Sequence, residues 1–68
     1  MGDMTMAQII TIFFKSDICT WYQIINANTE KIICNTYGRL ASMDEKYKFY
    51  DCKKITFDNG QVNFYIYI

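Results

Sequence analysis

The residue types of this chain that can do chemistry are three cysteines and one lysine-rich stretch. Cys19, Cys34 and Cys52 are odd in number and widely spaced, which is not the pattern of a disulfide framework. The chain has no histidine and no Cys-x-x-Cys pair, so the usual ligands of zinc are missing. We therefore expect buried thiols in an intracellular, reducing (cytoplasmic) setting, with no cofactor and no metal.

Signatures of catalysis are missing from the sequence. There is no histidine to act as a general base, no glycine-rich phosphate loop and no nucleophile elbow. Asp44 and Glu45 are adjacent carboxylates, but they stand where the start of a helix favours negative charge. A thiol nucleophile would need a base and an electropositive site, and nothing marks one cysteine as favoured. We predict that the chain is not an enzyme.

The lysine-rich stretch is "EKYKFYDCKK", in which lysines alternate with aromatic residues, as in grooves that bind single-stranded nucleic acid. Residues 44–54 hold four lysines but also three acidic residues, Asp44, Glu45 and Asp51. Phosphate binding scales with the number of unopposed positive charges, so a solvated face is the preferred interpretation. A nucleic-acid-binding small β-barrel, Sm-like or OB-like, is the alternative function.

Part of this region resembles the first signature of the Sm-like RNA-binding family. In "YGRLASMDEKYK", Gly38, Leu40 and Asp44 fit that signature, but Lys48 stands where the family has an asparagine that contacts RNA. The family's second signature is not matched by "FDNGQV". The resemblance implies an RNA-binding ring to which only Asp44 carries over, and we do not assign the chain to the family from it.

Size and composition favour a protein that associates with others. A chain of 68 residues makes one domain with a small core, and such domains often depend on a partner. Aromatic residues make up 18% of the chain, and they supply both cores and interface centres. Seven basic residues balance seven acidic ones, so no overall field attracts nucleic acid or anionic lipid.

The remaining compositional expectations concern setting and origin. No apolar run has the length of a membrane span, and the first residues lack the order of a signal peptide, so no membrane contact is expected. Residues 1–6 are expected to be a flexible N-terminus, and residues 7–68 a single small β-rich domain. The abundance of Ile, Lys, Asn, Tyr and Phe suits an AT-rich genome, which suggests a phage or viral protein.

The first three quarters of the chain predict strands and one short helix. "AQIITIFFK" (7–15) reads as a strand buried on both faces, although periodicity alone does not distinguish it from a buried helix. Segments 18–26 and 30–37 form a hairpin, with Ile25 opposite Ile32 and Ile24 opposite Ile33. Gly38 marks a bulge or bend. "SMDE" has the form of a capping box and predicts a short helix near 43–49.

The last stretch gives the clearest prediction, a β-hairpin turning at Asn59-Gly60. A two-residue type I′ turn there places Phe57 opposite Val62 and Lys54 opposite Tyr65. One hairpin face is then apolar. The other face is polar with two tyrosines, and is assigned the residues Cys52, Lys54, Thr56, Asn63, Tyr65 and Tyr67.

The absence of charge in residues 61–68 bears on architecture. An exposed edge strand normally carries Lys, Pro or a bulge, and neither terminal strand, 8–14 or 61–68, has one. We expect these strands to be interior, to pair with each other and close a barrel, or to pair with another chain.

Together these patterns predict an all-β or β-rich α+β fold, a small curved antiparallel sheet or barrel of about five strands. The expected function is a non-enzymatic protein-protein interaction module that binds a protein partner or itself as a homo-oligomer, with a phage or viral inhibitor or accessory protein as the working hypothesis. The expected binding residues are Lys54, Tyr65 and Tyr67, with Lys48 and Tyr50.

Overall fold

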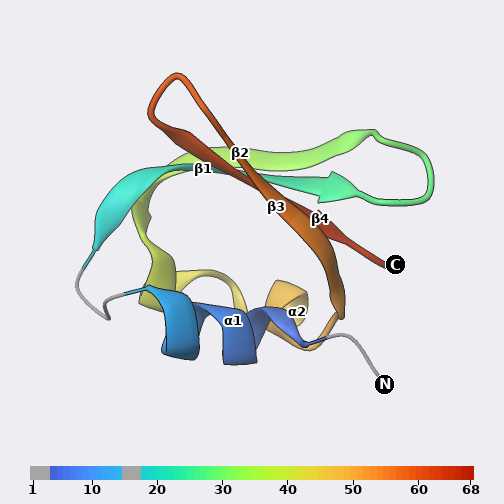
Figure 1. The fold of residues 1–68 in the computed structure, drawn as a ribbon, viewed down its shortest axis with the longest axis horizontal. Helices are drawn as coiled ribbons and strands as arrows, with labels where there is room; N and C mark the ends of the chain where they lie inside the picture. Colours follow the sequence, from blue (N-terminus) through green and yellow to red (C-terminus); the bar gives the residue numbers. More distant parts are fainter. Residues whose placement is uncertain (1–3, 15–17) are drawn as a thin grey trace.

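The computed structural model describes residues 4–14 and 18–68, and it is strand-rich. Within these residues four strands form one mixed sheet in the order β2-β1-β4-β3, with two α-helices and a 3-10 turn beneath it (Figure 1). The elements are α1 (Met6–Phe13), β1 (Cys19–Asn26), β2 (Ile32–Arg39), η1 (Leu40–Ser42), α2 (Glu45–Lys48), β3 (Cys52–Asp58) and β4 (Gln61–Ile66). This confirms a small β-rich fold with a short helix near 43–49. Of the two expected forms, sheet or barrel, the structure has the open sheet, with four strands rather than about five and with one parallel pair.

The segment expected to be the first strand is the helix α1. Thr5 and Gln8 form a capping box, in which Gln8 N–H donates to Thr5 Oγ1 at 3.3 Å and Thr5 N–H donates to Gln8 Oε1 at 2.9 Å. Met6, Ile9 and Ile10 are buried, which is the i, i+3, i+4 spacing of one helix face. Residues 1–3 lie outside the described residues, but Thr5 and Met6 belong to the fold, so the folded domain begins before residue 7.

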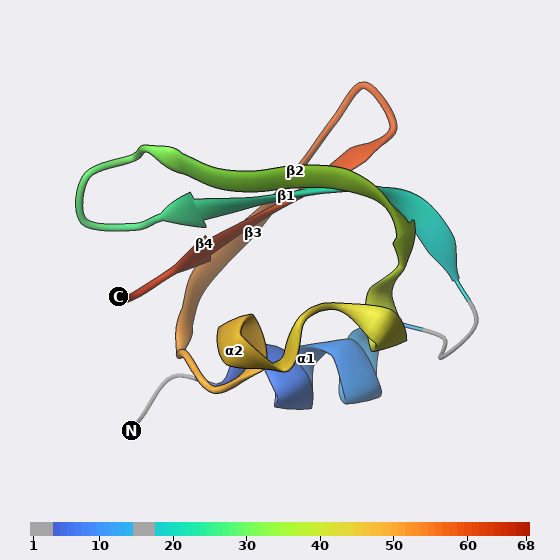
Figure 2. The same cartoon turned by 180° about the vertical axis from the view of Figure 1, so that it is seen from behind.

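The two strands at the centre of the sheet, β1 and β4, are parallel. Tyr22 pairs with Val62, and Ile24 with Phe64. All four side chains are buried. The view from behind shows that the helices cover one side of the sheet (Figure 2). The core they form with the helices comprises Met6, Ile9, Ile10, Tyr22, Ile24, Leu40, Met43, Cys52, Val62, Phe64 and Ile66.

The β3–β4 hairpin has the register predicted from its turn. Asn59 and Gly60 have φ of 50° and 75°, as the two central residues of a type I′ turn require. Phe57 pairs with Val62 and Lys54 with Tyr65. The assignment of Cys52 to the polar face is wrong, because the register shifts between Cys52 and Lys54 and turns the cysteine into the core beside Ile66.

The β1–β2 hairpin is also present, with its register shifted along most of its length. Ile25 pairs with Ile32 as expected, but Ile24 pairs with Cys34 rather than Ile33. Ile33 is therefore the extra residue of a bulge. At Gly38, where a bulge or a bend was expected, the pairing with Thr20 is in regular register.

The position of the terminal segments in the sheet is only partly as expected. β4 is an interior strand, which explains how a stretch without charge avoids exposing an edge. The sheet edges within the described residues are β2 and β3.

The start of α2 differs from the capping box expected at "SMDE". Asp44 caps the helix by accepting from Lys46 N–H at 3.1 Å, while Ser42 belongs to η1.

The cysteines differ in burial, so the expectation of three buried thiols holds for one of them. Cys52 is buried, Cys34 is half-buried and Cys19 is exposed. Cys19 and Cys34 pair with Arg39 and Ile24, so they are not cross-strand neighbours, as predicted.

No helix in the described part of the chain combines the length and apolar character that crossing a membrane requires.

Candidate functional site

The candidate site is the face of the sheet that points away from the helices, here called the open face. Strand alternation and the observed register place on it one set of side chains from each strand. The set comprises Cys19, Trp21, Gln23 and Ile25 of β1, Ile32, Asn35, Tyr37 and Arg39 of β2, Lys54, Thr56 and Asp58 of β3, and Gln61, Asn63 and Tyr65 of β4. In Figure 1 this is the upper side of the sheet, opposite α1 and α2.

A row of amide and hydroxyl side chains, the amide row, crosses the middle of the open face. Asn35, Gln23, Asn63 and Thr56 stand at directly paired positions on β2, β1, β4 and β3. Asn35 Nδ2 donates to Gln23 Oε1 at 3.0 Å, and Asn63 Nδ2 donates to Thr56 Oγ1 at 3.1 Å. Gln61 Nε2 donates to Asn63 Oδ1 at 2.8 Å. These bonds fix the side chains. Asn35 is exposed and Gln23 and Thr56 are half-buried, whereas Asn63 is buried, so the row presents a preorganised polar surface through its three other members.

An aromatic pair lies next to the amide row. Trp21 and Tyr37 occupy paired positions on β1 and β2, and their rings meet edge to face with centroids 5.5 Å apart. The side chains are 54% and 58% exposed, although each is large and mostly apolar. Two rigid aromatic residues held together on a sheet and still open to solvent are a surface suited to contact with another molecule.

On the other side of the amide row lie the two predicted site residues Lys54 and Tyr65. They are directly paired on β3 and β4, and the Lys54 ammonium lies 4.6 Å from the centroid of the Tyr65 ring. Ile25 pairs with Tyr65 on its other side and is only 5% exposed. The structure therefore brings Lys54 and Tyr65 together as part of the open face.

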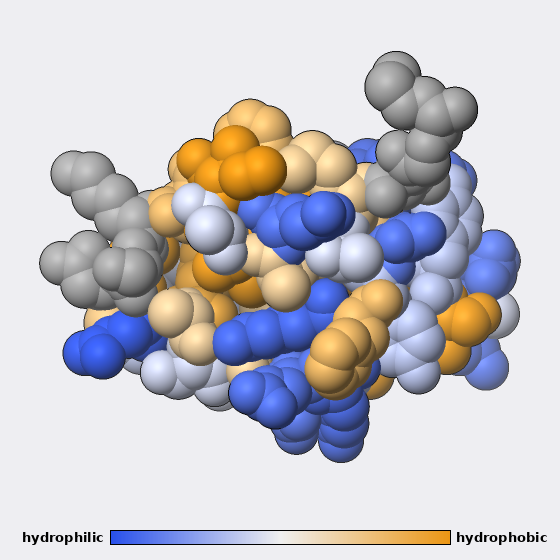
Figure 3. Space-filling view, turned by 90° about the horizontal axis from the view of Figure 1, so that it is seen from below, coloured by the Kyte–Doolittle hydropathy of each residue, from blue (hydrophilic) through white to orange (hydrophobic). Residues whose placement is uncertain are grey.

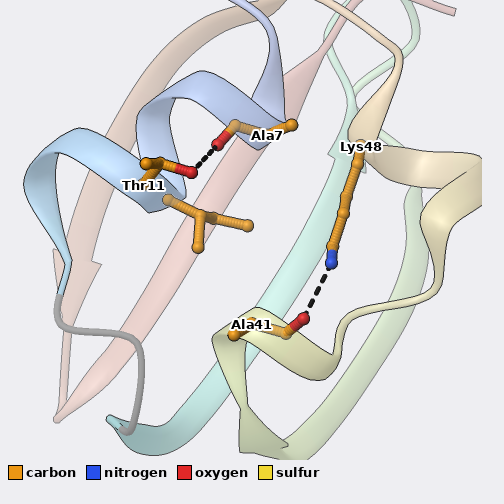
Figure 4. A pocket seen from close by; sticks show the side chains of 5 residues that line it. Ala7, Thr11, Ala41 and Lys48 are labelled. Carbon is orange, nitrogen blue, oxygen red and sulfur yellow. Dashed lines mark hydrogen bonds between the residues drawn. The ribbon is translucent and has the colours of Figure 1, made fainter.

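The remaining predicted residues are spread over the molecule. Lys48 lies in α2 on the helix side, where its Nζ donates to the Ala41 carbonyl at 2.7 Å across a small hollow beside Ala7 and Thr11 (Figure 4). Tyr50 and Tyr67 are partly exposed at the junction of α2 with β3 and after the end of β4. The structure does not bring Lys48 into one surface with Lys54.

The lysine-rich stretch does not form a single groove. Lys46 and Lys48 are on the helix side, whereas Lys54 is on the open face. Lys46 lies 3.8 Å from the Asp44 carboxylate and 5.1 Å from the centre of the Tyr47 ring. Figure 3 looks onto the helix side, where polar and apolar residues are interspersed. Asp44, the residue that the Sm-like resemblance carried over, caps α2 there.

Charge on the open face is low. Arg39 and Lys54 are its basic residues and Asp58 its acidic one, which leaves a balance of one positive charge. Among the described residues no group of three or more His, Cys, Asp or Glu side chains is placed to hold a metal ion. What the open face offers is therefore contact area, aromatic rings and fixed hydrogen-bonding groups.

One tyrosine of β1, Tyr22, lies beneath the sheet and not on the open face. Burial beneath the sheet raises the pKa of Tyr22 above its usual 10.0, because the phenolate loses solvation there. Smaller contributions in the same direction come from Cys34, Asp44 and Tyr47. Tyr22 is thus a core residue and not a binding residue.

The sequence analysis missed Trp21, Tyr37 and the amide row. The signal was present in "TWYQII", where Trp21 and Gln23 alternate with the buried Tyr22 and Ile24. The bulge at Ile33 was not predicted, and without it Asn35 and Tyr37 are not assigned to the same face of the sheet as Trp21 and Gln23.

Comparison of the chain with family models, with curated proteins and with solved structures finds no match. The function is therefore argued from the open face itself.

Proposed function

We propose that the chain is a small non-enzymatic protein-interaction module that binds a partner protein through its open face. The observation that carries the proposal is the Trp21–Tyr37 pair, which is more than half exposed and is held on a sheet beside a fixed amide row. Trp, Tyr and Arg are the residue types that dominate binding energy at protein interfaces. Charged residues are depleted at interface centres, as they are at the centre of this face.

The chemistry of the open face also defines the partner. With one basic residue in excess, it has little to attract a polyanion, and binding of phosphates scales with the number of such charges. A partner surface that is uncharged, apolar at its centre and able to exchange hydrogen bonds with Asn and Gln side chains fits this face. That the chain is a phage or viral inhibitor or accessory protein stays a prediction from its composition.

The test compares capture of partner proteins by three forms of the immobilised protein. We expect Trp21→Ser with Tyr37→Ser to lose a partner that the unmodified protein retains, because the aromatic centre is removed. The matched control is Phe13→Ser with Phe49→Ser, which removes two exposed aromatic residues from the helix side and should retain the partner. Equal capture by all three forms would refute the proposal.

A second measurement separates protein binding from nucleic-acid binding. Fluorescence of Trp21 is followed during titration with short single-stranded RNA and DNA at two salt concentrations. We expect no saturable change. A change that saturates and weakens steeply with salt would favour a nucleic-acid-binding sheet instead.

A further inference from the structure

The two edges of the sheet differ in how they are protected against pairing with other strands. β3 has a register shift at Lys53 and exposed lysines at 53 and 54, which are standard ways of blocking an edge. β2 is eight residues long; its bulge lies near its start, at Ile33, and the stretch 34–38 that follows carries no charge, no proline and no bulge. Its one charged residue is Arg39, at the end. Within the described residues β2 pairs with β1 on one side and has no strand on the other.

We propose that the open edge of β2 pairs with β2 of a second copy of this chain, antiparallel and centred on Thr36. A two-fold axis perpendicular to the sheet relates such copies, so the open faces of both remain on the same side. The four strands of each copy then form one continuous sheet of eight, and all helices cover its other side. This inference goes beyond the proposed function, because it concerns the sheet edge and not the open face.

The register centred on Thr36 follows from the side chains that it brings together. Thr36 meets Thr36 of the second copy, Asn35 meets Tyr37, and Arg39 meets Ile33, so no like charges are opposed. Two copies centred one pair earlier, on Asn35, would place Lys31 opposite Arg39, which is unfavourable. The pairing on Thr36 also sets the two Tyr37 rings diagonally across the seam, where aromatic side chains can reach each other.

Space beside Gly38 supports the same register. In this pairing Gly38 lies opposite Cys34 of the second copy, on the side that the helices cover. A Cβ built at Gly38 would meet nothing within 4 Å in the described part of the structure, so there is room for the cysteine side chain. Because one strand pair is a small interface, we expect a reversible dimer with a dissociation constant on the order of micromolar.

The first experiment needs no variant, since light scattering over a dilution series gives the native mass of the unmodified protein. We expect the mass to rise from that of a monomer towards that of a dimer as concentration increases. A mass that stays monomeric up to millimolar concentration would overturn the proposal. That result would leave the proposed function standing, because partner capture by the open face is measured separately.

The second experiment identifies the seam by disulfide trapping in a Cys19→Ser, Cys34→Ser background. Directly opposed residues of antiparallel strands have Cα atoms about 4.5–5.5 Å apart, within the range that a disulfide spans. We expect Thr36→Cys to form a covalent dimer on mild oxidation. Thr56→Cys is the matched control, a half-buried threonine on the other edge strand, and should stay monomeric. Trapping by Thr56→Cys, or by Asn35→Cys in preference to Thr36→Cys, would overturn the assigned seam.

Discussion

The glycines at positions 60 and 38 provide a paired test of the fold, because the same substitution should have opposite effects at the two sites. Gly60 is the second central residue of the β3–β4 turn and has φ of 75°, a conformation that an L-residue adopts at a cost. Gly38 lies within β2 and is not among the described residues with positive φ. At neither site would an added Cβ meet an atom within 4 Å in the described structure, so backbone conformation alone decides the outcome.

The expected magnitudes follow from that difference. Gly60→Ala should lower the free energy of unfolding by about 1 kcal/mol, which for a domain of this size lowers the Tm by about 4–8 °C. Gly38→Ala should raise the free energy of unfolding by about 0.5 kcal/mol, because alanine loses less conformational freedom than glycine when a strand forms. The Tm would then rise by about 2–4 °C.

The assay is thermal unfolding followed by circular dichroism, at low protein concentration so that association does not contribute. Urea unfolding of the same variants gives the free energies directly. If both variants lose stability to the same extent, or if Gly60→Ala unfolds at the Tm of the unmodified protein, the turn and register described here are wrong.

Two further substitutions test the N-terminal helix and the buried tyrosine. Thr5→Ala should cost about 1 kcal/mol in urea unfolding, because α1 loses its capping box; Thr11→Ala, in the same helix but exposed, should change stability by less than half as much, and equal losses would contradict the role of the cap. Tyr22 has a raised pKa in the folded state, so its contribution to stability is complete below the usual 10.0 and is lost as the pH rises from there through the folded-state pKa. The free energy of unfolding of Tyr22→Phe should therefore fall less between pH 8 and pH 11 than that of the unmodified protein, as measured by urea unfolding at each pH. If the two proteins lose the same free energy of unfolding over this range, the pKa of Tyr22 is the same in the folded and unfolded states and the reasoning is wrong.

Sequence reasoning succeeded where a local signal sets the structure. Asn59-Gly60 determines the β3–β4 register because only one turn type suits both residues, and that register placed Lys54 beside Tyr65 on the open face. A short loop over residues 27–30 gave the correct pairing of Ile25 with Ile32. These parts of the chain depend on residues that are close together in sequence.

Sequence reasoning failed where the structure is determined by one extra residue in a strand or by a contact between segments far apart in sequence. The bulge at Ile33 reverses which β2 residues face the core, so Asn35 and Tyr37 were not assigned to the open face. The segment of α1 contains Ile and Phe residues that favour strands, and its helix depends on the Thr5 cap and on burial of Met6 and Ile9 beneath the sheet. The parallel pairing of β1 with β4 has no local signature, since nothing between the two strands specifies it.

That parallel pairing has a consequence for how the chain folds. Each hairpin closes through a short turn, and such turns form within microseconds. Trp21 and Gln61, in contrast, are paired across 40 positions of sequence, so the entropy of closing a long loop opposes their contact until both hairpins exist. We expect the two hairpins to form early and the β1–β4 seam to form in the rate-limiting step. Substitutions at Ile24 or Phe64, which pair across that seam, should then slow folding. Changes in the Asn59-Gly60 turn should mainly alter the fraction of unfolded chains in which the β3–β4 hairpin has already formed.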